Sequence, residues 1–191
     1  MGLLDSLFGR SKPVEPKLDQ VFSLPSAGIT LQSSLGLVTT GQAGVCYKAT
    51  PGATAMTSDD EIRSLLTVDD TDGKISITVD ELGYNWIVIH DDDLADLVAR
   101  VHGAHTTLTE NGLGPHLLCS VFGFRPATPP GEGSVQLVYL AKSGTFYPFA
   151  PRDQKRRDNE YEIRIKNFLE EELPIESDLS RWMALWGNPV S

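Results

Sequence analysis

The sequence has few cysteines and no long hydrophobic run, and each shortage argues against a class of protein. Its two cysteines, Cys46 and Cys119, lie far apart in apolar stretches of the 191-residue chain. A disulfide-stabilised fold normally has more cysteines in a shorter chain, so both are interpreted as reduced core residues, and a single bridge between them stays open. No apolar stretch approaches the roughly 18 residues that a transmembrane helix needs.

Positive charge is also scarce. The chain has 16 Lys and Arg residues against 26 Asp and Glu residues, which gives a net charge of -10 at pH 7. Binding to a phosphate backbone needs a basic surface, so we expect no nucleic acid among the partners. A hydrophobic content of 40% and the length of the chain suit one globular domain with one sizeable core.

The motifs of metal binding, nucleophilic catalysis and phosphate binding are missing. His102 and His105 are three residues apart on a predicted helix, but no third ligand follows at a recognisable spacing, so we interpret them as a neutral or exposed pair. The aspartates at 91–93 are interpreted as capping residues at a helix start. No nucleophile elbow or Walker motif occurs. We therefore expect no catalytic residue, no metal ligand and no cofactor.

What the sequence does have is an apolar segment at residues 2–10, ahead of the first predicted core element. Its four large apolar side chains lie on one side of a short predicted helix: Leu3, Leu4, Leu7 and Phe8. Residues 11–17 contain two prolines and are predicted to be a linker. A targeting signal is a poor explanation, because the basic start, the sustained apolar run and the small-residue cleavage site are all missing.

Two explanations for this segment stay open, a helix packed on the domain and a docking element for a membrane or a partner. Four buried side chains contribute about 1.5–3 kcal/mol each, and the cost of ordering a flexible peptide offsets much of that gain. Residues 2–10 have one Arg and one Asp, so anionic lipid adds little attraction. Any membrane contact is therefore expected to be weak, reversible and peripheral.

Residues 18–191 are predicted to form a single domain in which helices and strands arrive in neighbouring runs. Helices are expected at 18–35, 58–68, 91–112 and 158–173, with a short one capped near Ser177 or Asp178. Strands are expected at 36–49, 75–83, 84–90, 115–125 and 134–142, the last continuing through 143–151 past a turn or bulge. Short connections favour an antiparallel sheet. The predicted fold is α+β, with about five strands and helices on one face.

Two further groups of residues are candidates for contacts with a partner. A basic run consists of Arg152, Lys155, Arg156 and Arg157. It is interpreted as a solvated loop, with an acidic partner or anionic lipid as the alternative. Trp182 and Trp186 are four residues apart, so a terminal helix would place both rings on one face, where they either pack on the domain or fill a partner's groove.

Several stretches, in order along essentially the whole chain, resemble one family. They are "MGLLDSLFGR", "LPSAGITLQ", "LGYNWIVIH", "GLGPHLLCSVFGF", "YLAKSGTFYPFAP", "RRDNEYEI" and "DLSRWMALWG". Together they are similar to PspA-associated proteins of the PspAB type. That resemblance implies an accessory of the phage-shock response to envelope stress, with PspA or another phage-shock protein as partner. It implies a cytoplasmic protein, with a peripheral position at the inner face of the membrane as an alternative, and it supplies no established catalytic residues to carry over to this chain.

The order of predicted elements also resembles that of YbjN-like and type III secretion chaperone-like domains. Those domains bind other proteins, often as dimers, so the resemblance implies a binding role and a homodimer as an alternative to the monomer. Our first hypothesis is a non-enzymatic adaptor that offers apolar surface to a partner. The second is a small-molecule binder or unrecognised enzyme with a pocket near the sheet, using His102, His105 or Cys119.

Overall fold

The computed structural model describes residues 16–48, 64, 73–128, 131 and 133–190. The predicted apolar segment at 2–10 lies outside the described residues, as does nearly all of the helix predicted at 58–68. None of the described helices is both long and apolar enough to cross a membrane.

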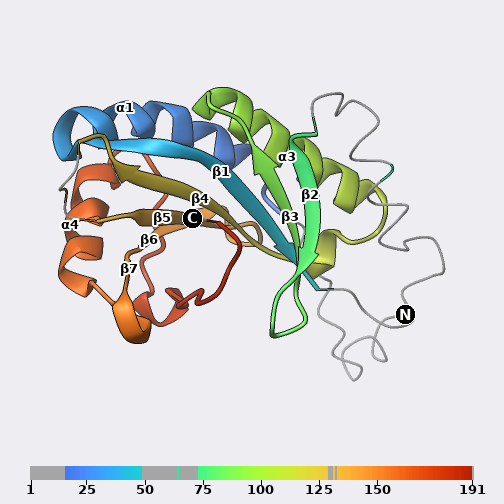
Figure 1. Ribbon diagram of the computed structural model, residues 1–191. Coiled ribbons are helices and arrows are strands. Elements are labelled where there is room, and N and C mark those ends of the chain that lie inside the picture. The colour runs from blue at the N-terminus through green and yellow to red at the C-terminus, as the bar shows by residue number, and fades with distance from the viewer. Residues whose placement is uncertain (1–15, 49–63, 65–72, 129–130, 132, 191) are drawn as a thin grey trace, which may run out of the picture.

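A six-stranded antiparallel sheet forms the centre of the molecule, in the order β2-β3-β1-β4-β5-β6 (Figure 1). Its strands are β1 (Leu37–Tyr47), β2 (Ile75–Val79), β3 (Asn85–His90), β4 (Leu117–Pro126), β5 (Val135–Leu140) and β6 (Thr145–Phe149). A two-stranded ribbon, β7 (Pro151–Arg152) with β8 (Arg156–Arg157), follows β6. The predicted α+β fold with an antiparallel sheet is confirmed.

The sixth strand arises at the turn predicted near Ser143. The amide of Gly144 donates a hydrogen bond to the carbonyl of Leu140 at 2.8 Å, and Gly144 has a φ of 71°, a left-handed conformation that favours glycine. The chain therefore reverses instead of continuing as one strand. β5 and β6 pair as an antiparallel hairpin, which gives six strands in place of about five.

Helices cover one face of the sheet, as predicted. They are α1 (Leu24–Leu35), α3 (Leu94–Glu110) and α4 (Asn159–Leu169), with α1 and α3 across the sheet and α4 beside β6 (Figure 1). The helix predicted at 18–35 is divided: a 3-10 turn, η1 (Asp19–Ser23), precedes α1, and Pro25 occupies the first turn of α1. Asp93 caps the start of α3, since its carboxylate accepts hydrogen bonds from two backbone amides of the first turn, at 2.8 and 3.0 Å.

Alternation along the strands divides the buried residues into two cores. Val45, Ile87 and Phe122 face the helices, and their neighbours in sequence face the other way. The second core joins side chains of the opposite sheet face to the end of the chain: Cys46, Trp86, Val88, Cys119, Val121, Val138, Tyr147, Phe149, Trp182 and Val190. The sheet is therefore buried on both faces, by helices on one and by the C-terminal segment on the other.

The C-terminal segment, residues 174–190, is mostly irregular, with one 3-10 turn, η4 (Leu179–Arg181), capped by Asp178. The backbone of this segment is hydrogen-bonded to a side chain of the sheet, since Gln136 donates to the Val190 carbonyl at 2.6 Å. A Cβ at Gly44 would lie 2.9 Å from a methyl group of Val190, so β1 needs a glycine where the segment crosses it. The sequence predicted the cap but not this second layer.

Candidate docking groove

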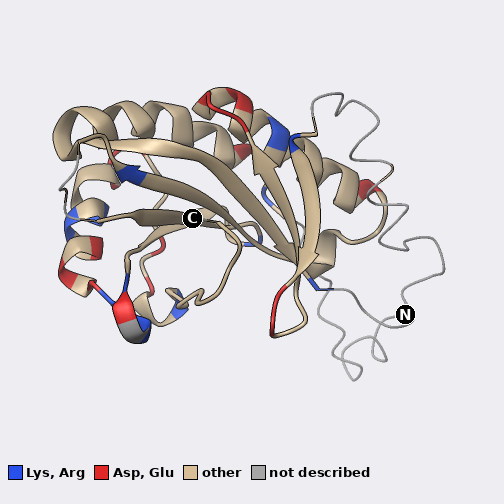
Figure 2. Cartoon of the chain, viewed as in Figure 1, with Lys and Arg blue, Asp and Glu red and all other residues tan. Residues whose placement is uncertain are grey.

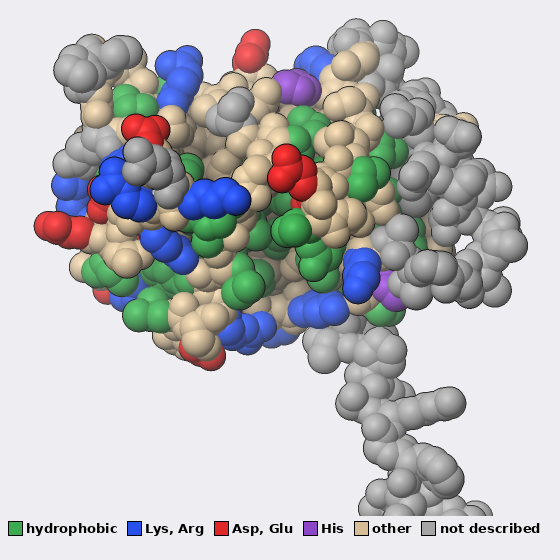
Figure 3. Space-filling view, turned by 60° about the horizontal axis from the view of Figure 1, so that its bottom comes forward, with side chains coloured by type: hydrophobic (Ala, Val, Ile, Leu, Met, Phe, Trp, Pro, Cys, Tyr) green, Lys and Arg blue, Asp and Glu red, His purple; other side chains and the backbone are tan. Residues whose placement is uncertain are grey.

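An apolar groove of about 370 Å³ opens on the sheet face that the C-terminal segment covers. Hydrophobic side chains gather around a hollow in this face, with basic side chains at its margins (Figure 3). The lining residues come from three places, the sheet floor, the β2–β3 turn and the C-terminal segment: Cys46, Asp80, Leu82, Tyr84, Trp86, Leu118, Cys119, Leu140, Tyr147, Met183, Ala184, Leu185, Trp186 and Asn188.

The two cysteines form part of the groove floor. Cys46 and Cys119 are directly opposite each other on β1 and β4, and both are buried free thiols. The hydrogen-bonding interaction of the Cys119 thiol with Cys46 and, after it, burial raise the pKa of Cys119 well above its ordinary value. A thiol held in its protonated form is a weak nucleophile, so these residues supply an apolar surface.

One wall of the groove is the β2–β3 turn, which Asp80 holds in shape. Its carboxylate accepts hydrogen bonds, each of 2.9 Å, from the amides of Leu82 and Tyr84 and from the indole nitrogen of Trp86. Desolvation acts to raise the pKa of the Asp80 carboxyl, but these hydrogen bonds outweigh it and keep the pKa below its usual value. The fixed turn presents the Leu82 side chain with 78% of its surface exposed.

The other wall is the C-terminal segment, which Trp182 anchors. Its buried ring stacks on Tyr147 with centroids 5.9 Å apart, and its indole nitrogen donates to the carbonyl of Glu176 at 3.0 Å. The Tyr147 hydroxyl donates to the Met183 carbonyl at 3.0 Å, while the Met183 side chain remains 61% exposed. The backbone at Met183 is therefore fixed, while its apolar side chain is left exposed to solvent.

The structure separates the two tryptophans that the sequence predicted on one helix face. Residues 182–186 are not helical, and Trp182 is buried under the segment. Trp186 is half-buried at the groove and meets Phe149 edge-on, with centroids 5.0 Å apart. Trp186 is thus the member of the pair with surface available to a partner.

The basic run is largely occupied by contacts within the protein. Charged residues gather at α4 and the ribbon before it, whereas most of the sheet is uncharged (Figure 2). Arg157 pairs with the buried Glu162 at 2.9 Å, donates to the Trp182 carbonyl at 2.7 Å, and lies over the Phe149 ring at 5.3 Å. Arg157 therefore connects α4 to the C-terminal segment.

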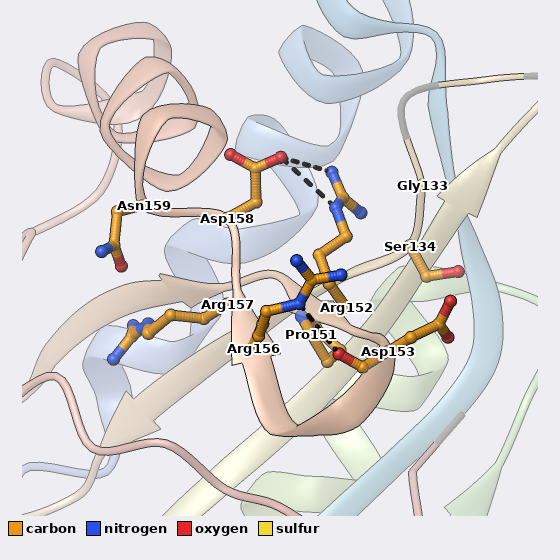
Figure 4. Close-up of a pocket in the computed structure, with 9 residues that line it drawn as sticks. All are labelled: Gly133, Ser134, Pro151, Arg152, Asp153, Arg156, Arg157, Asp158 and Asn159. Carbon is orange, nitrogen blue, oxygen red and sulfur yellow. Dashed lines mark hydrogen bonds and ion pairs between the residues drawn. The ribbon is translucent and has the colours of Figure 1, made fainter.

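Three residues of the basic run, Arg152, Arg156 and Arg157, border an open, polar pocket of about 740 Å³ (Figure 4). Arg152 is paired with Asp158 at 2.8 Å, and this ion pair, after a hydrogen bond from the Tyr161 amide, keeps the pKa of Asp158 below its usual value. Lys155 and Arg156 are exposed. Since two of the four cations are matched by carboxylates, the patch carries less free positive charge than its sequence indicates.

The histidines are not brought to Cys119. His105 is fully buried between α3 and the sheet, with its Nε2 2.6 Å from the Ser120 hydroxyl. Burial, followed by the charge of His102, lowers the pKa of His105 to about 3, so the ring is neutral. Ser120 faces the helices and Cys119 the groove, so the sheet lies between His105 and the thiols. No three potential metal-ligating side chains cluster within the described part of the chain.

Sequence reasoning missed the exposed side chains at the groove rim, Leu82 and Met183. Leu82 lies in the "DELG" turn, where an apolar residue at the tip of a hairpin is itself a signal, because turns are normally polar. Met183 carried no such signal, since its exposure follows from the irregular path of the C-terminal segment.

Comparison with known proteins gives one family. A family model described as PspAB, PspA associated protein B, matches residues 1–190. Searches of curated proteins and of solved structures gave no match.

Proposed function

Because the chain belongs to the PspA-associated protein B family, we propose that it is a non-enzymatic adaptor that binds an apolar segment of PspA in the groove on the sheet. The family description names association with PspA, and the groove is an apolar hollow that such a partner can fill. In this proposal the protein acts by binding PspA and catalyses no reaction.

The observation that supports this role most strongly is the exposure of large apolar side chains on both sides of the groove. Leu82 and Met183 are 78% and 61% exposed and border one hollow, although each is carried by a backbone that hydrogen bonds hold in place. Exposed apolar side chains that converge on a hollow are typical of protein-binding surfaces. A rigid backbone also lowers the entropic cost of binding.

The test is a binding titration of purified PspA against a groove variant. Replacing Leu82 and Met183 together by serine removes apolar surface from both rims and leaves the hydrogen-bonded backbone unchanged. If each side chain contributes about 1–2 kcal/mol, affinity falls by roughly 30-fold to 1,000-fold. Ile29→Ser is the matched control, because Ile29 is 71% exposed on α1, across the sheet from the groove. Equal affinity of both variants for PspA would contradict the proposal.

A weak peripheral membrane contact and a cytoplasmic location belong to the same proposal. The apolar residues at 2–10 would add reversible attachment to a bilayer. Deleting residues 1–10 and measuring sedimentation with anionic vesicles tests this contact, and undiminished sedimentation would remove the segment from membrane recruitment.

The alternative occupant of the groove is a small apolar molecule. A volume of about 370 Å³ lies in the range of small-molecule sites, and the floor is apolar. Native mass spectrometry of the purified chain distinguishes the two functions, because a retained small molecule adds a fixed mass that the Leu82/Met183 serine variant would lose.

A further inference from the structure

The described chain starts at the β5–β6 turn, at the end of the sheet. The amide of Lys17 donates to the carbonyl of Ala141 at 2.8 Å, and the hydroxyl of Tyr139 donates to the carbonyl of Lys17. The side chain of Lys17 also packs on the β5–β6 turn, since a Cβ at Gly144 would lie 3.0 Å from it. Leu140, which precedes Ala141 directly, lines the groove. The point from which residues 1–15 extend is therefore fixed at the β5–β6 turn, on the helix side of the sheet and one residue away from a side chain that lines the groove.

The intervening chain is long enough to reach the groove. Residues 11–15 separate the apolar segment at 2–10 from Pro16, and five extended residues span about 17 Å. The groove floor is formed by the neighbouring strands β1, β4 and β5, which are spaced about 4.8 Å apart. The linker is thus as long as several strand spacings, which lets the segment pass from the β5–β6 turn around the end of the sheet toward the floor.

The segment and the groove also match in chemistry. Residues 2–10 carry four large apolar side chains on one predicted helix face and one charge of each sign. The groove offers an apolar floor and exposed leucine and methionine side chains, and the carboxylate of Asp80 is occupied by the turn that it holds. Neither the segment nor the groove therefore needs a charged group on the surface that it contacts.

We propose that residues 2–10 occupy this groove in the free protein as a tethered occupant, and that a partner must displace them. The inference rests on the proposed function in that the same groove receives PspA. A short tether keeps the segment at millimolar effective concentration, so a weak contact suffices to hold it. Displacement would couple partner binding to release of Leu3, Leu4, Leu7 and Phe8 for a second contact.

Acrylamide quenching of tryptophan fluorescence tests the contact in the isolated full-length chain. Trp86 and Trp182 are 2% and 6% exposed, so quenching reports mainly on Trp186 at the groove. The double variant Leu4→Ser with Phe8→Ser should raise the quenching constant by about twofold, because the tethered segment no longer shields the ring. The control Ser6→Asn changes the polar side of the same segment and should leave quenching as in the parent.

A second measurement uses the chain without residues 1–12. A peptide of residues 1–12 added at about 1 mM should restore the low quenching of the parent, because that concentration approaches the effective concentration of the tether. Equal quenching of the parent and the Leu4/Phe8 variant, or no effect of the peptide, would overturn the proposal. Protection that increases with protein concentration would also overturn it, since the occupant would then be a second copy.

The two proposals fail in different ways. If the Leu82/Met183 serine variant binds PspA normally while the peptide still shields Trp186, self-docking stands and the PspA site lies elsewhere. If that variant loses PspA while the Leu4/Phe8 variant quenches like the parent, the groove binds PspA and residues 2–10 do not occupy it.

Discussion

At the scale of the residue, His105 shows how burial decides the role of an ionisable side chain. Its ring is enclosed between α3 and the sheet, stacks near Tyr139 and contacts the Ser120 hydroxyl at 2.6 Å. No charged partner compensates a protonated imidazole there, so its pKa falls to about 3. The same residue type that suits acid–base catalysis is here a neutral part of the core.

This burial predicts a pH dependence of stability. The unfolded chain binds a proton at His105 below the usual pKa of 6.5, whereas the folded protein stays neutral down to a pKa of about 3. The stability contribution is therefore complete above pH 6.5, and the free energy of unfolding falls by up to about 1.4 kcal/mol per pH unit as the pH decreases. Urea unfolding between pH 7 and 5 measures this slope.

His105→Gln should flatten the slope, even if the variant is less stable at every pH. His90→Gln removes an exposed histidine at the end of β3 and serves as the control. An unchanged slope in His105→Gln would show that another group is responsible for the pH dependence.

At the scale of the element, the sequence predicted most of the helices and strands because their patterns are local. Alternating or continuous apolar patterns placed β1 to β5, and the aspartates at 91–93 marked the start of α3, where the structure has Asp93 as the cap. The hairpin at Gly144 was predicted only as a turn or bulge in a continuing strand, because the reversal depends on pairing between β5 and β6.

The C-terminal segment and the groove were less predictable. Residues 182–190 have no periodicity, and their path depends on long-range contacts such as Gln136 with Val190 and Arg157 with Trp182. The sequence placed Trp186 among candidate docking residues, but it could not show that Trp182 is buried or that Leu82 lies across the groove. The groove was not predicted because the residues that form it are far apart in the sequence, and not because their secondary-structure propensities are weak.

Glu162 tests how α4 is connected to the C-terminal segment. It is 2% exposed, pairs with Arg157 and accepts a hydrogen bond from the Ala150 amide at 2.8 Å. Glu162→Gln should lower the free energy of unfolding by about 3 kcal/mol, because it leaves the Arg157 guanidinium without its counter-charge. Urea titration measures the loss, and Glu160→Gln, exposed on the same helix, is the control. A loss equal to that of the control would show that this ion pair contributes little.

At the scale of the whole molecule, one sheet separates two cores with different coverings. Among the described residues, three helices close one side, while the opposite side depends on one irregular segment and leaves a groove beside it. An acidic chain with net charge -10 thus keeps an apolar groove on the sheet face that the C-terminal segment covers. Because the C-terminal segment forms one wall of the groove, the shape of the groove depends on the position of that segment.

Trp182 is the anchor on which that covering depends. Trp182→Ala removes the ring stacked on Tyr147 and the hydrogen bond to the Glu176 carbonyl, so the free energy of unfolding should fall by about 3–5 kcal/mol. Loosening of the segment should also expose Cys46 and Cys119, and iodoacetamide should then alkylate them faster under native conditions. Leu179→Ala is the control, because Leu179 is 57% exposed in the same segment. If the thiols of Trp182→Ala react no faster than those of the control, the segment is held by its other contacts, and the groove keeps its shape without the anchor.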